Sequence, residues 1–156
     1  MKLNEKSRAF VEKLGLMFER MGFPRTKGRM MGLLLVTDSP LSLTEMTELL
    51  QSSKASLSTN TRTAEQMGWL QRASVPGDRR TYYEITPGSF EEMLRQRLKA
   101  MISFIHVIEE GLDAVEEDNT IARARLLKMK AFYEFFLAEM QESLDRWHEH
   151  ERSLDG

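Results

Sequence analysis

The sequence predicts a mainly α-helical protein with one small β-hairpin, and three observations support this fold class. Apolar residues recur every three or four positions in most of the chain, which is the spacing of a helix face. A Pro-Gly turn between two strand-like runs interrupts that pattern near the middle. Two long heptad patterns, separated by a short acidic break, fill the C-terminal part. With 156 residues, 41% of them apolar and 29% charged, the chain has the size and composition of about one globular domain.

Composition excludes several classes of protein. The chain has no cysteine, which excludes a disulfide framework, a thiol nucleophile and a thiolate metal site. The longest apolar run, Met30 to Val36, is far shorter than the roughly 20 residues that cross a bilayer. The N-terminus lacks a charged-then-apolar leader. We therefore expect a soluble cytoplasmic protein that makes no use of a membrane.

The net charge of -2 hides an asymmetry between the two halves of the chain. Residues 1–80 contain 13 Lys and Arg against 8 Asp and Glu, a net charge of +5, whereas residues 81–156 contain 9 against 16, a net charge of -7. A basic half joined to an acidic half favours a protein that meets phosphate with one end only. Charges scattered over solvated surfaces remain the alternative.

Residues 1–22 are expected to form an N-terminal amphipathic helix. Asn4 is a suitable N-cap, and Gly22 followed by Pro24 is a strong stop signal. Its apolar stripe consists of Phe10, Val11, Leu14, Met17, Phe18 and Met21. So wide a stripe requires a packing partner, for which we expect the helices at the far end of the chain or those of a second subunit.

A second helix is predicted from Arg25 to about Thr37, and it is apolar on nearly all sides after its first turn. Gly28 and Gly32 lie four positions apart, so one side of this helix has no side chains and another helix can approach it closely. A basic cluster opens the helix, where free N–H groups and the helix dipole favour phosphate; plain solvation of these side chains is the alternative. The cluster consists of Arg25, Lys27 and Arg29.

Two short helices follow with helix-turn-helix spacing. Ser42 and Glu45 form a capping box at the start of the first, which ends near Leu50. Ser53 can cap the second, which runs from Lys54 to about Met67 and ends at Gly68. Three or four residues separate the two helices, which is the length that this motif requires.

The second of these helices is the candidate DNA reader. Its inward positions would be Leu57, Thr61 and Ala64. Its outward positions would be Lys54, Ser56, Ser58, Thr59 and Arg62, a small, polar and mildly cationic face without an acid. Such a face can enter a major groove roughly 12 Å wide, hydrogen-bond to base edges and neutralise phosphate. A solvated Ser/Thr-rich helix is the alternative. Ser and Thr are poor helix formers, however, so these residues lower the stability of the helix without any structural benefit.

The strand-like runs WLQRASV and TYYEI enclose the turn PGDRR and predict a β-wing. Arg79 and Arg80 would lie at its tip, within reach of a minor groove or of flanking phosphates, and Asp78 could orient one of them. Residues 23–87 are therefore expected to form a winged helix-turn-helix DNA-binding domain.

The run SKASLSTNTRTAEQMGWLQRASVPGDRRTYYEIT resembles the winged helix of the MarR family of bacterial transcription regulators. With FPRTKGRMMGLLL upstream, it is most similar to the GbsR branch of that family, over residues 1–100. The resemblance implies a homodimeric repressor that binds a near-palindromic operator. By position, Ser58, Thr59 and Arg62 would face the groove, Lys54 and Ser56 would sit at the helix start, and one wing arginine would enter the groove.

The sequence also departs from the family pattern. Thr61 and Ala64 stand where the family has larger apolar residues, which implies a looser fit of this helix to its core. The strand that ends at Ile85 is one residue shorter than in the family. Which of the two arginines, Arg79 or Arg80, enters the groove is therefore left open.

Residues 88–152 are predicted to form a long C-terminal antiparallel helical hairpin for dimerisation. The helices would span 88–117 and 120–150, with an acidic corner at 117–119. The seam of the first consists of Leu98, Met101, Ile105, Ile108, Leu112 and Val115. The seam of the second consists of Ala122, Leu126, Met129, Tyr133, Phe136, Met140, Leu144 and Trp147. Further apolar residues flank both seams, more than two helices can bury on each other, so a second subunit is expected.

A small effector is also implied by the GbsR resemblance. It would be an osmolyte-type quaternary ammonium compound such as choline, which aromatic faces can hold. The candidate side chains are Trp69, Tyr82, Phe104, Tyr133 and Trp147. Core packing is the alternative role for most of them, and the ligand site remains unknown.

Two rival functions have less support. A metal enzyme would need carboxylate-histidine pairs on several helices, and only His106 with Glu109 and Asp145 with His148 are available, so we expect no enzyme, no metal and no cofactor. A winged-helix protein–protein interaction module or scaffold without DNA binding shares the predicted fold. Salt dependence separates it from a DNA-binding protein. For such a protein, the slope of log affinity against log salt concentration steepens by about one for each phosphate contacted.

Overall fold

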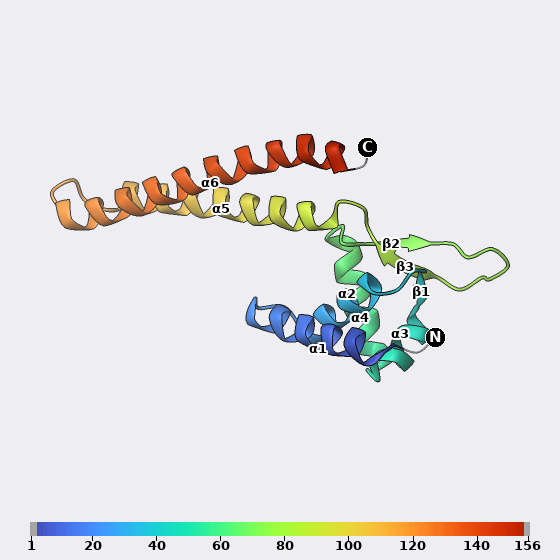
Figure 1. Ribbon diagram of the computed structural model, residues 1–156. Coiled ribbons are helices and arrows are strands. Elements are labelled where there is room, and N and C mark those ends of the chain that lie inside the picture. The colour runs from blue at the N-terminus through green and yellow to red at the C-terminus, as the bar shows by residue number, and fades with distance from the viewer. Residues whose placement is uncertain (1–2, 155–156) are drawn as a thin grey trace. The chain divides into compact units, whose positions relative to one another are not determined.

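The computed structural model describes residues 3–154, apart from the side chains of His148 and Leu154. Its elements are α1 (Glu5–Arg20), α2 (Arg25–Leu35), β1 (Leu41–Ser42), α3 (Leu43–Leu50), α4 (Lys54–Gln66), β2 (Leu70–Ala73), β3 (Tyr82–Ile85), α5 (Ser89–Ala114) and α6 (Thr120–Leu154) (Figure 1). They form two compact units, one that extends to Phe90 and one that begins at Glu91. The mainly α-helical fold with a small β-wing is confirmed.

Helix α1 packs against α2 within the first unit. The side chain of Asn4 caps α1 by accepting a 2.8 Å hydrogen bond from the Ser7 N–H, as predicted. A Cβ atom on Gly28 of α2 would lie 2.6 Å from the Cβ of Phe18 on α1, so the two helices meet at backbone distance. The predicted close approach at this glycine is therefore confirmed. Helix α2 covers the Val11 and Phe18 side of α1, whereas Phe10, Met17 and Met21 of the predicted stripe stay exposed, so packing of that part on a further surface stays a prediction.

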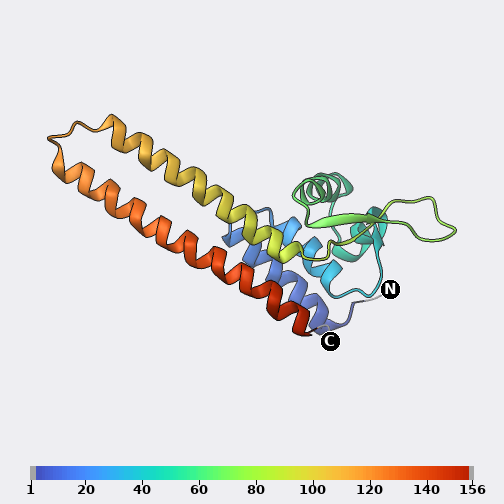
Figure 2. The ribbon, with the colours of Figure 1, turned by 90° about the horizontal axis from the view of Figure 1, so that it is seen from above.

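The strands form a three-stranded antiparallel sheet in the order β1-β3-β2. Leu70 and Ala73 of β2 pair with Ile85 and Tyr82 of β3, which confirms the wing hairpin. Figure 2 shows its loop extending away from the helices of the first unit. Strand β1 was not predicted, because two residues are too few to show a strand pattern.

The core of the first unit gathers around α2 and the inner side of α4. Leu57, Thr61 and Ala64 are all at most 2% exposed, so the predicted inward face of α4 is confirmed. The Thr61 hydroxyl donates to the Leu57 carbonyl at 2.7 Å, which satisfies its polar atom inside the core. Other buried apolar residues here are Met30, Leu33, Met46, Leu50, Trp69 and Leu70.

Helices α5 and α6 run antiparallel, side by side, in both views (Figures 1 and 2). The predicted boundaries need correction: α5 ends at Ala114, three residues early, and α6 continues to Leu154. Arg123 closes the corner by donating from Nη1 to the carbonyls of Leu112 at 2.8 Å and Val115 at 3.1 Å. No helix within the described residues is long and apolar enough to cross a membrane.

The hairpin buries one seam and leaves a wide apolar surface exposed. The buried seam consists of Leu98, Ile105, Ile108, Leu112 and Leu144. Exposed large apolar residues include Phe90, Leu94, Ile102, Phe104, Val107, Ile121, Leu127, Met129, Phe132, Phe135, Phe136 and Trp147. The expectation that two helices cannot bury all of this surface on each other agrees with these exposures.

Candidate DNA-binding surface

Two side-chain caps set the geometry of the α3–turn–α4 unit. At α3, the Ser42 hydroxyl accepts from the Glu45 N–H at 3.3 Å, and the Glu45 carboxylate accepts from the Ser42 N–H at 2.7 Å. Gln51 then adopts a left-handed conformation, with φ of 48°, and turns the chain. Ser53 caps α4 by accepting from the Ser56 N–H at 3.2 Å. Both predicted caps are confirmed, and they orient α4 relative to α3.

The outer face of α4 is polar and open. Lys54, Ser58, Thr59 and Arg62 are exposed, whereas Ser56 is half-buried beside the cap. Within residues 3–154, neither Lys54 nor Arg62 is paired with a carboxylate, since the ion pairs of the first unit join other residues. This face can therefore offer two cations and three hydroxyl groups to a partner.

An acidic residue near the end of α4 is neutralised within the fold. Arg72 of β2 forms a 2.7 Å ion pair with Glu65, and that hydrogen bond raises the pKa of Arg72 above its usual value. A bare carboxylate beside the outer face would repel phosphate, and the pairing removes most of that repulsion. The sequence analysis did not identify this pair, because its two residues lie on different elements.

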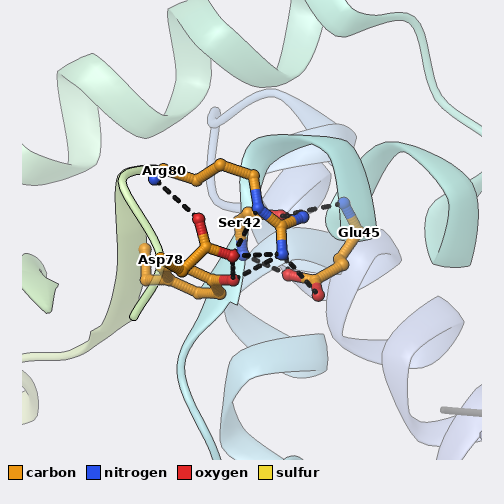
Figure 3. A network of polar contacts seen from close by, with 5 residues as sticks. Ser42, Glu45, Asp78 and Arg80 are labelled. Atoms are coloured by element: carbon orange, nitrogen blue, oxygen red, sulfur yellow. Dashed lines mark hydrogen bonds and ion pairs between the residues drawn. The ribbon is translucent and has the colours of Figure 1, made fainter. Parts of the chain in front are cut away.

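The two wing arginines have different surroundings. Arg79 is exposed, and no ion pair or hydrogen bond of its side chain is found in the described part of the chain. The Arg80 guanidinium instead turns back toward the fold (Figure 3). It donates to Asp78 Oδ2 at 2.7 Å from Nη2 and at 2.9 Å from Nε, and to the Tyr82 hydroxyl at 2.6 Å. The prediction that Asp78 orients one arginine is confirmed for Arg80.

This network reaches the start of α3. Arg80 Nη1 donates to Ser42 Oγ at 3.4 Å, and its Nη2 lies 3.9 Å from Glu45 Oε1 (Figure 3). Hydrogen bonds from Arg80 hold the pKa of Asp78 well below its usual range, and those same contacts raise the pKa of Arg80. Hydrogen bonds from Ser42 lower the pKa of Glu45. Both carboxylates are thus charged at neutral pH and balance the arginine.

Arg25 and Arg29 both bind Glu12 of α1. Arg25 Nη2 lies 2.9 Å from Glu12 Oε2, and Arg29 Nη2 lies 2.7 Å from Oε1. Arg29 also donates to the Leu50 carbonyl at 2.8 Å and to Ser52 Oγ at 3.1 Å. The Arg29 side chain is 22% exposed, so contacts within the protein already use most of its donors. These contacts favour a structural role for Arg29 over phosphate binding.

Lys27 was grouped with Arg25 and Arg29 as a phosphate ligand, and that prediction was wrong. Only 5% of Lys27 is exposed, and its ammonium lies 5.6 Å from the Phe23 ring centre and 5.3 Å from the Trp69 ring centre. Met67 Sδ is 3.8 Å from its Nζ. Burial lowers the pKa of Lys27, and two aromatic faces partly replace its lost hydration.

The C-terminal histidines do not build a metal site in the described residues. His106 Nδ1 lies 3.1 Å from Glu109, whose carboxylate also binds Lys130 at 2.7 Å, so this pair belongs to an ion network between α5 and α6. No group of three metal-ligating side chains is found among the residues whose side chains are described. The second pair, Asp145 with His148, falls partly outside them, because the His148 side chain is not described.

Comparison with known proteins places the chain in a family. Residues 88–150 match the model of the MmpR5-like MarR family transcriptional regulators. The chain is 33% identical over 139 residues to the HTH-type transcriptional regulator MmpR5 of Mycobacterium tuberculosis, and the match covers 88% of this chain and 84% of that protein. A crystal structure of a transcriptional regulator superposes with a TM-score of 0.78 and 32% identity, and covers 92% of this chain and 99% of that one. The chain therefore belongs to the MarR family of winged-helix, DNA-binding transcriptional regulators and is not an enzyme.

Proposed function

We propose that the protein is a homodimeric repressor that inserts α4 into the major groove of a near-palindromic operator. The observation that carries this proposal is the contrast between the two faces of α4. Its inner face is buried to 2% exposure or less at Leu57, Thr61 and Ala64. Its outer face combines the unpaired cations Lys54 and Arg62 with short hydroxyl side chains. Such a face fits a groove lined by base-edge acceptors and flanked by phosphates.

The outer residues divide by position along α4. Lys54 and Ser56 lie in the first turn, where free N–H groups add to the attraction for a phosphate. Ser58, Thr59 and Arg62 lie further along and would meet base edges, Arg62 through two parallel hydrogen bonds to a guanine. One of the two wing arginines, Arg79 or Arg80, would add a contact from the wing. Arg25 remains a proposed contact with a flanking phosphate, in competition with Glu12, whereas Arg29 would first have to leave Glu12, Leu50 and Ser52.

The exposed apolar surface of α5 and α6 supports the dimer. Phe132 is 60% exposed and Phe135 66%, and fully burying a phenylalanine is worth about 1.5 to 3 kcal/mol. A second copy of the hairpin offers the same surface in return, as a twofold interface requires. A dimer also fixes the distance between two copies of α4, which must be about 34 Å apart to enter successive major grooves.

The proposed function includes the binding of a small effector. The GbsR branch and its osmolyte-type quaternary ammonium ligand stay predictions from the sequence. Lys27 already lies over the Trp69 ring, and the Arg80 guanidinium lies 5.2 Å from the Tyr82 ring centre. A cation of the protein therefore stands where a quaternary ammonium ligand would contact each of these two rings. Of the other candidates, Phe104 and Tyr133 form a T-shaped pair with ring centres 5.0 Å apart. Choline binding by calorimetry, compared with a Phe104→Ala variant, would test that pair.

Substitution of Arg62 tests the proposed DNA contact. Arg62→Ala should weaken operator binding by about 1 to 3 kcal/mol and leave thermal unfolding nearly unchanged, because the side chain is exposed. Arg20→Ala, which removes an exposed arginine in the last turn of α1, is the matched control. Operator fragments selected from genomic DNA at physiological salt supply the ligand for a titration. Unchanged affinity in Arg62→Ala would remove this residue from the site.

A further inference from the structure

The wing carries two adjacent arginines, and the fold uses only one of them. Every Arg80 nitrogen of the guanidinium has a partner: Nε and Nη2 bind Asp78, Nη2 also binds Tyr82, and Nη1 binds Ser42 (Figure 3). The Tyr82 hydroxyl donates in turn to Asp78 Oδ2 at 2.7 Å, and the Arg80 backbone N–H donates to Asp78 Oδ1 at 2.9 Å. Arg80 is thus held from both its backbone and its side chain.

The partners of Arg80 come from both sides of a junction. Asp78 and Tyr82 belong to the wing and β3, whereas Ser42 and Glu45 form the capping box of α3. Ser42 also pairs with Tyr82 across the β1–β3 ladder. A single guanidinium therefore joins the wing to the N-terminus of the helix against which α4 packs, and the orientation of the wing is set by the helix-turn-helix.

The charges around the two arginines support the same distinction between them. Arg80 faces two carboxylates, Asp78 at 2.7 Å and Glu45 at 3.9 Å, so this group of three has a net negative charge and does not attract phosphate. Both arginines are exposed, with 50% of the Arg80 side chain open to solvent, but Arg79 has no carboxylate partner in residues 3–154. A contact between Arg80 and DNA would first require exchange of the Asp78 carboxylate, whereas Arg79 needs no exchange.

We propose that Arg80 is a positioning residue that fastens the wing to the start of α3, and that Arg79 is the wing arginine that contacts DNA. This inference rests on the proposed function, because it assigns roles within the same binding surface. It answers the question that two neighbouring arginines leave open in the sequence. It also assigns a role to Tyr82, whose hydroxyl joins Arg80 to Asp78 and whose side chain is otherwise buried.

The salt dependence of operator binding separates the two roles. A side chain that neutralises phosphate contributes about 0.9 to the slope of log affinity against log salt, whereas a positioning residue contributes nothing to it. Arg79→Gln should reduce that slope by about 0.9. Arg80→Gln should weaken binding by about tenfold at every salt concentration and leave the slope unchanged, because the wing loses its orientation and no phosphate contact is lost.

Tyr82→Phe provides a second variant that leaves all charges in place. It removes only the hydroxyl between Arg80 and Asp78, and should lower affinity about two- to tenfold with an unchanged slope. A slope that falls in Arg80→Gln, or that stays unchanged in Arg79→Gln, would overturn the assignment. Full affinity in Tyr82→Phe would show that the network does not position the wing. Wild-type protein that binds operator DNA without any salt dependence would instead contradict the proposed function.

Discussion

The two compact units bury their apolar residues to very different degrees. In the first, Met30, Leu33 and Met46 are fully covered by neighbouring elements of the same unit. In the second, Phe132 and Phe135 are more than half exposed although both helices are long and regular. A soluble protein rarely leaves so continuous an apolar surface in water. The comparison teaches that the first unit encloses a core of its own, whereas the second leaves its largest aromatic side chains for a further surface to cover.

Polar contacts divide the units in the same way. The first unit has networks that join several elements, such as Arg29 with Glu12, Leu50 and Ser52. In the hairpin, Lys130 of α6 forms a 2.7 Å ion pair with Glu109 of α5, and Arg123 donates to two backbone carbonyls at the corner. Many of its other pairs join residues four apart on a single helix, and such pairs contribute only about 0.3 to 0.5 kcal/mol each. The hairpin therefore depends mainly on apolar contacts for its cohesion.

The largest expected effect comes from substitutions in the exposed apolar surface of α6, which we propose as part of the dimer interface. The double variant Phe132→Glu, Phe135→Glu places two charges in that surface and should weaken the dimer by at least about 4 kcal/mol, roughly a thousandfold in dissociation constant. Sedimentation at micromolar concentration would detect the monomer. Gln141→Glu adds one charge at an exposed residue on the other side of α6 and should keep the dimer. Dimers in both variants would show that this surface is not the interface.

A pair of glycines tests the difference in packing. A Cβ atom on Gly28 would lie 2.7 Å from the Leu14 carbonyl oxygen, whereas one on Gly111 of α5 would lie 3.6 Å from Leu126 Cδ1. Gly28→Ala should therefore destabilise the protein by about 1 to 3 kcal/mol. Gly111→Ala should stabilise it by up to about 1 kcal/mol, because alanine is the better helix former. Thermal unfolding of both variants measures the contrast, and equal effects would contradict it.

Replacement of the buried Lys27 should raise the stability of the protein, in contrast to Gly28→Ala. Lys27→Met keeps the length of the side chain and removes an ammonium that has no carboxylate partner in the described residues, so it should stabilise the first unit by about 1 kcal/mol at pH 7. Because the pKa of Lys27 is lowered by burial, the unfolded chain binds more protons than the folded one as pH rises toward 10.5. Wild-type stability should therefore rise over that range, and the advantage of the variant should shrink. A constant advantage would show that Lys27 has the same pKa in the folded and the unfolded chain, so that burial does not lower it.

The smallest effect concerns Glu12. Its partial burial alone would raise its pKa, but hydrogen bonds and charges from Arg25 and Arg29 outweigh that contribution and lower it. The stabilisation is therefore present above the usual pKa of 4.5 and is lost as pH falls through the lower folded value. Because the carboxylate is 37% exposed and screened by water, Glu12→Gln should cost only about 0.5 kcal/mol at pH 7. Denaturant unfolding should show wild type and variant converging at low pH.

Repeating patterns made much of this fold predictable. The inner face of α4 follows the 3.6-residue period, and the capping box at Ser42 and the N-cap at Ser53 follow from short motifs. Strand β1 could not be predicted, because its two residues form a strand only through pairing with Tyr82 and Tyr83. Helix ends were displaced by a few residues, since the apolar pattern of α5 continues beyond Ala114 where the backbone already turns.

The surroundings of individual charges were the least predictable part. Lys27 and Arg29 are two positions apart, yet one is enclosed by aromatic rings and the other binds α1, α3 and the turn after α3. Apart from Phe23, those partners lie 17 or more residues away in sequence, so no local spacing reveals them. The outer residues of α4 and the wing contacts with DNA remain predictions, because only their exposure and pairing within the chain have been described.

Arg29 links α1 to the turn before α4, so a movement of one can be transmitted to the other. It binds Glu12 in the middle of α1 and also the Leu50 carbonyl and Ser52 in the turn before α4. A displacement of α1 would therefore be passed to the turn that sets the angle of α4. Whatever shifts α1, be it a small molecule or a neighbouring subunit, would reach through this one side chain the helix that we propose to contact DNA.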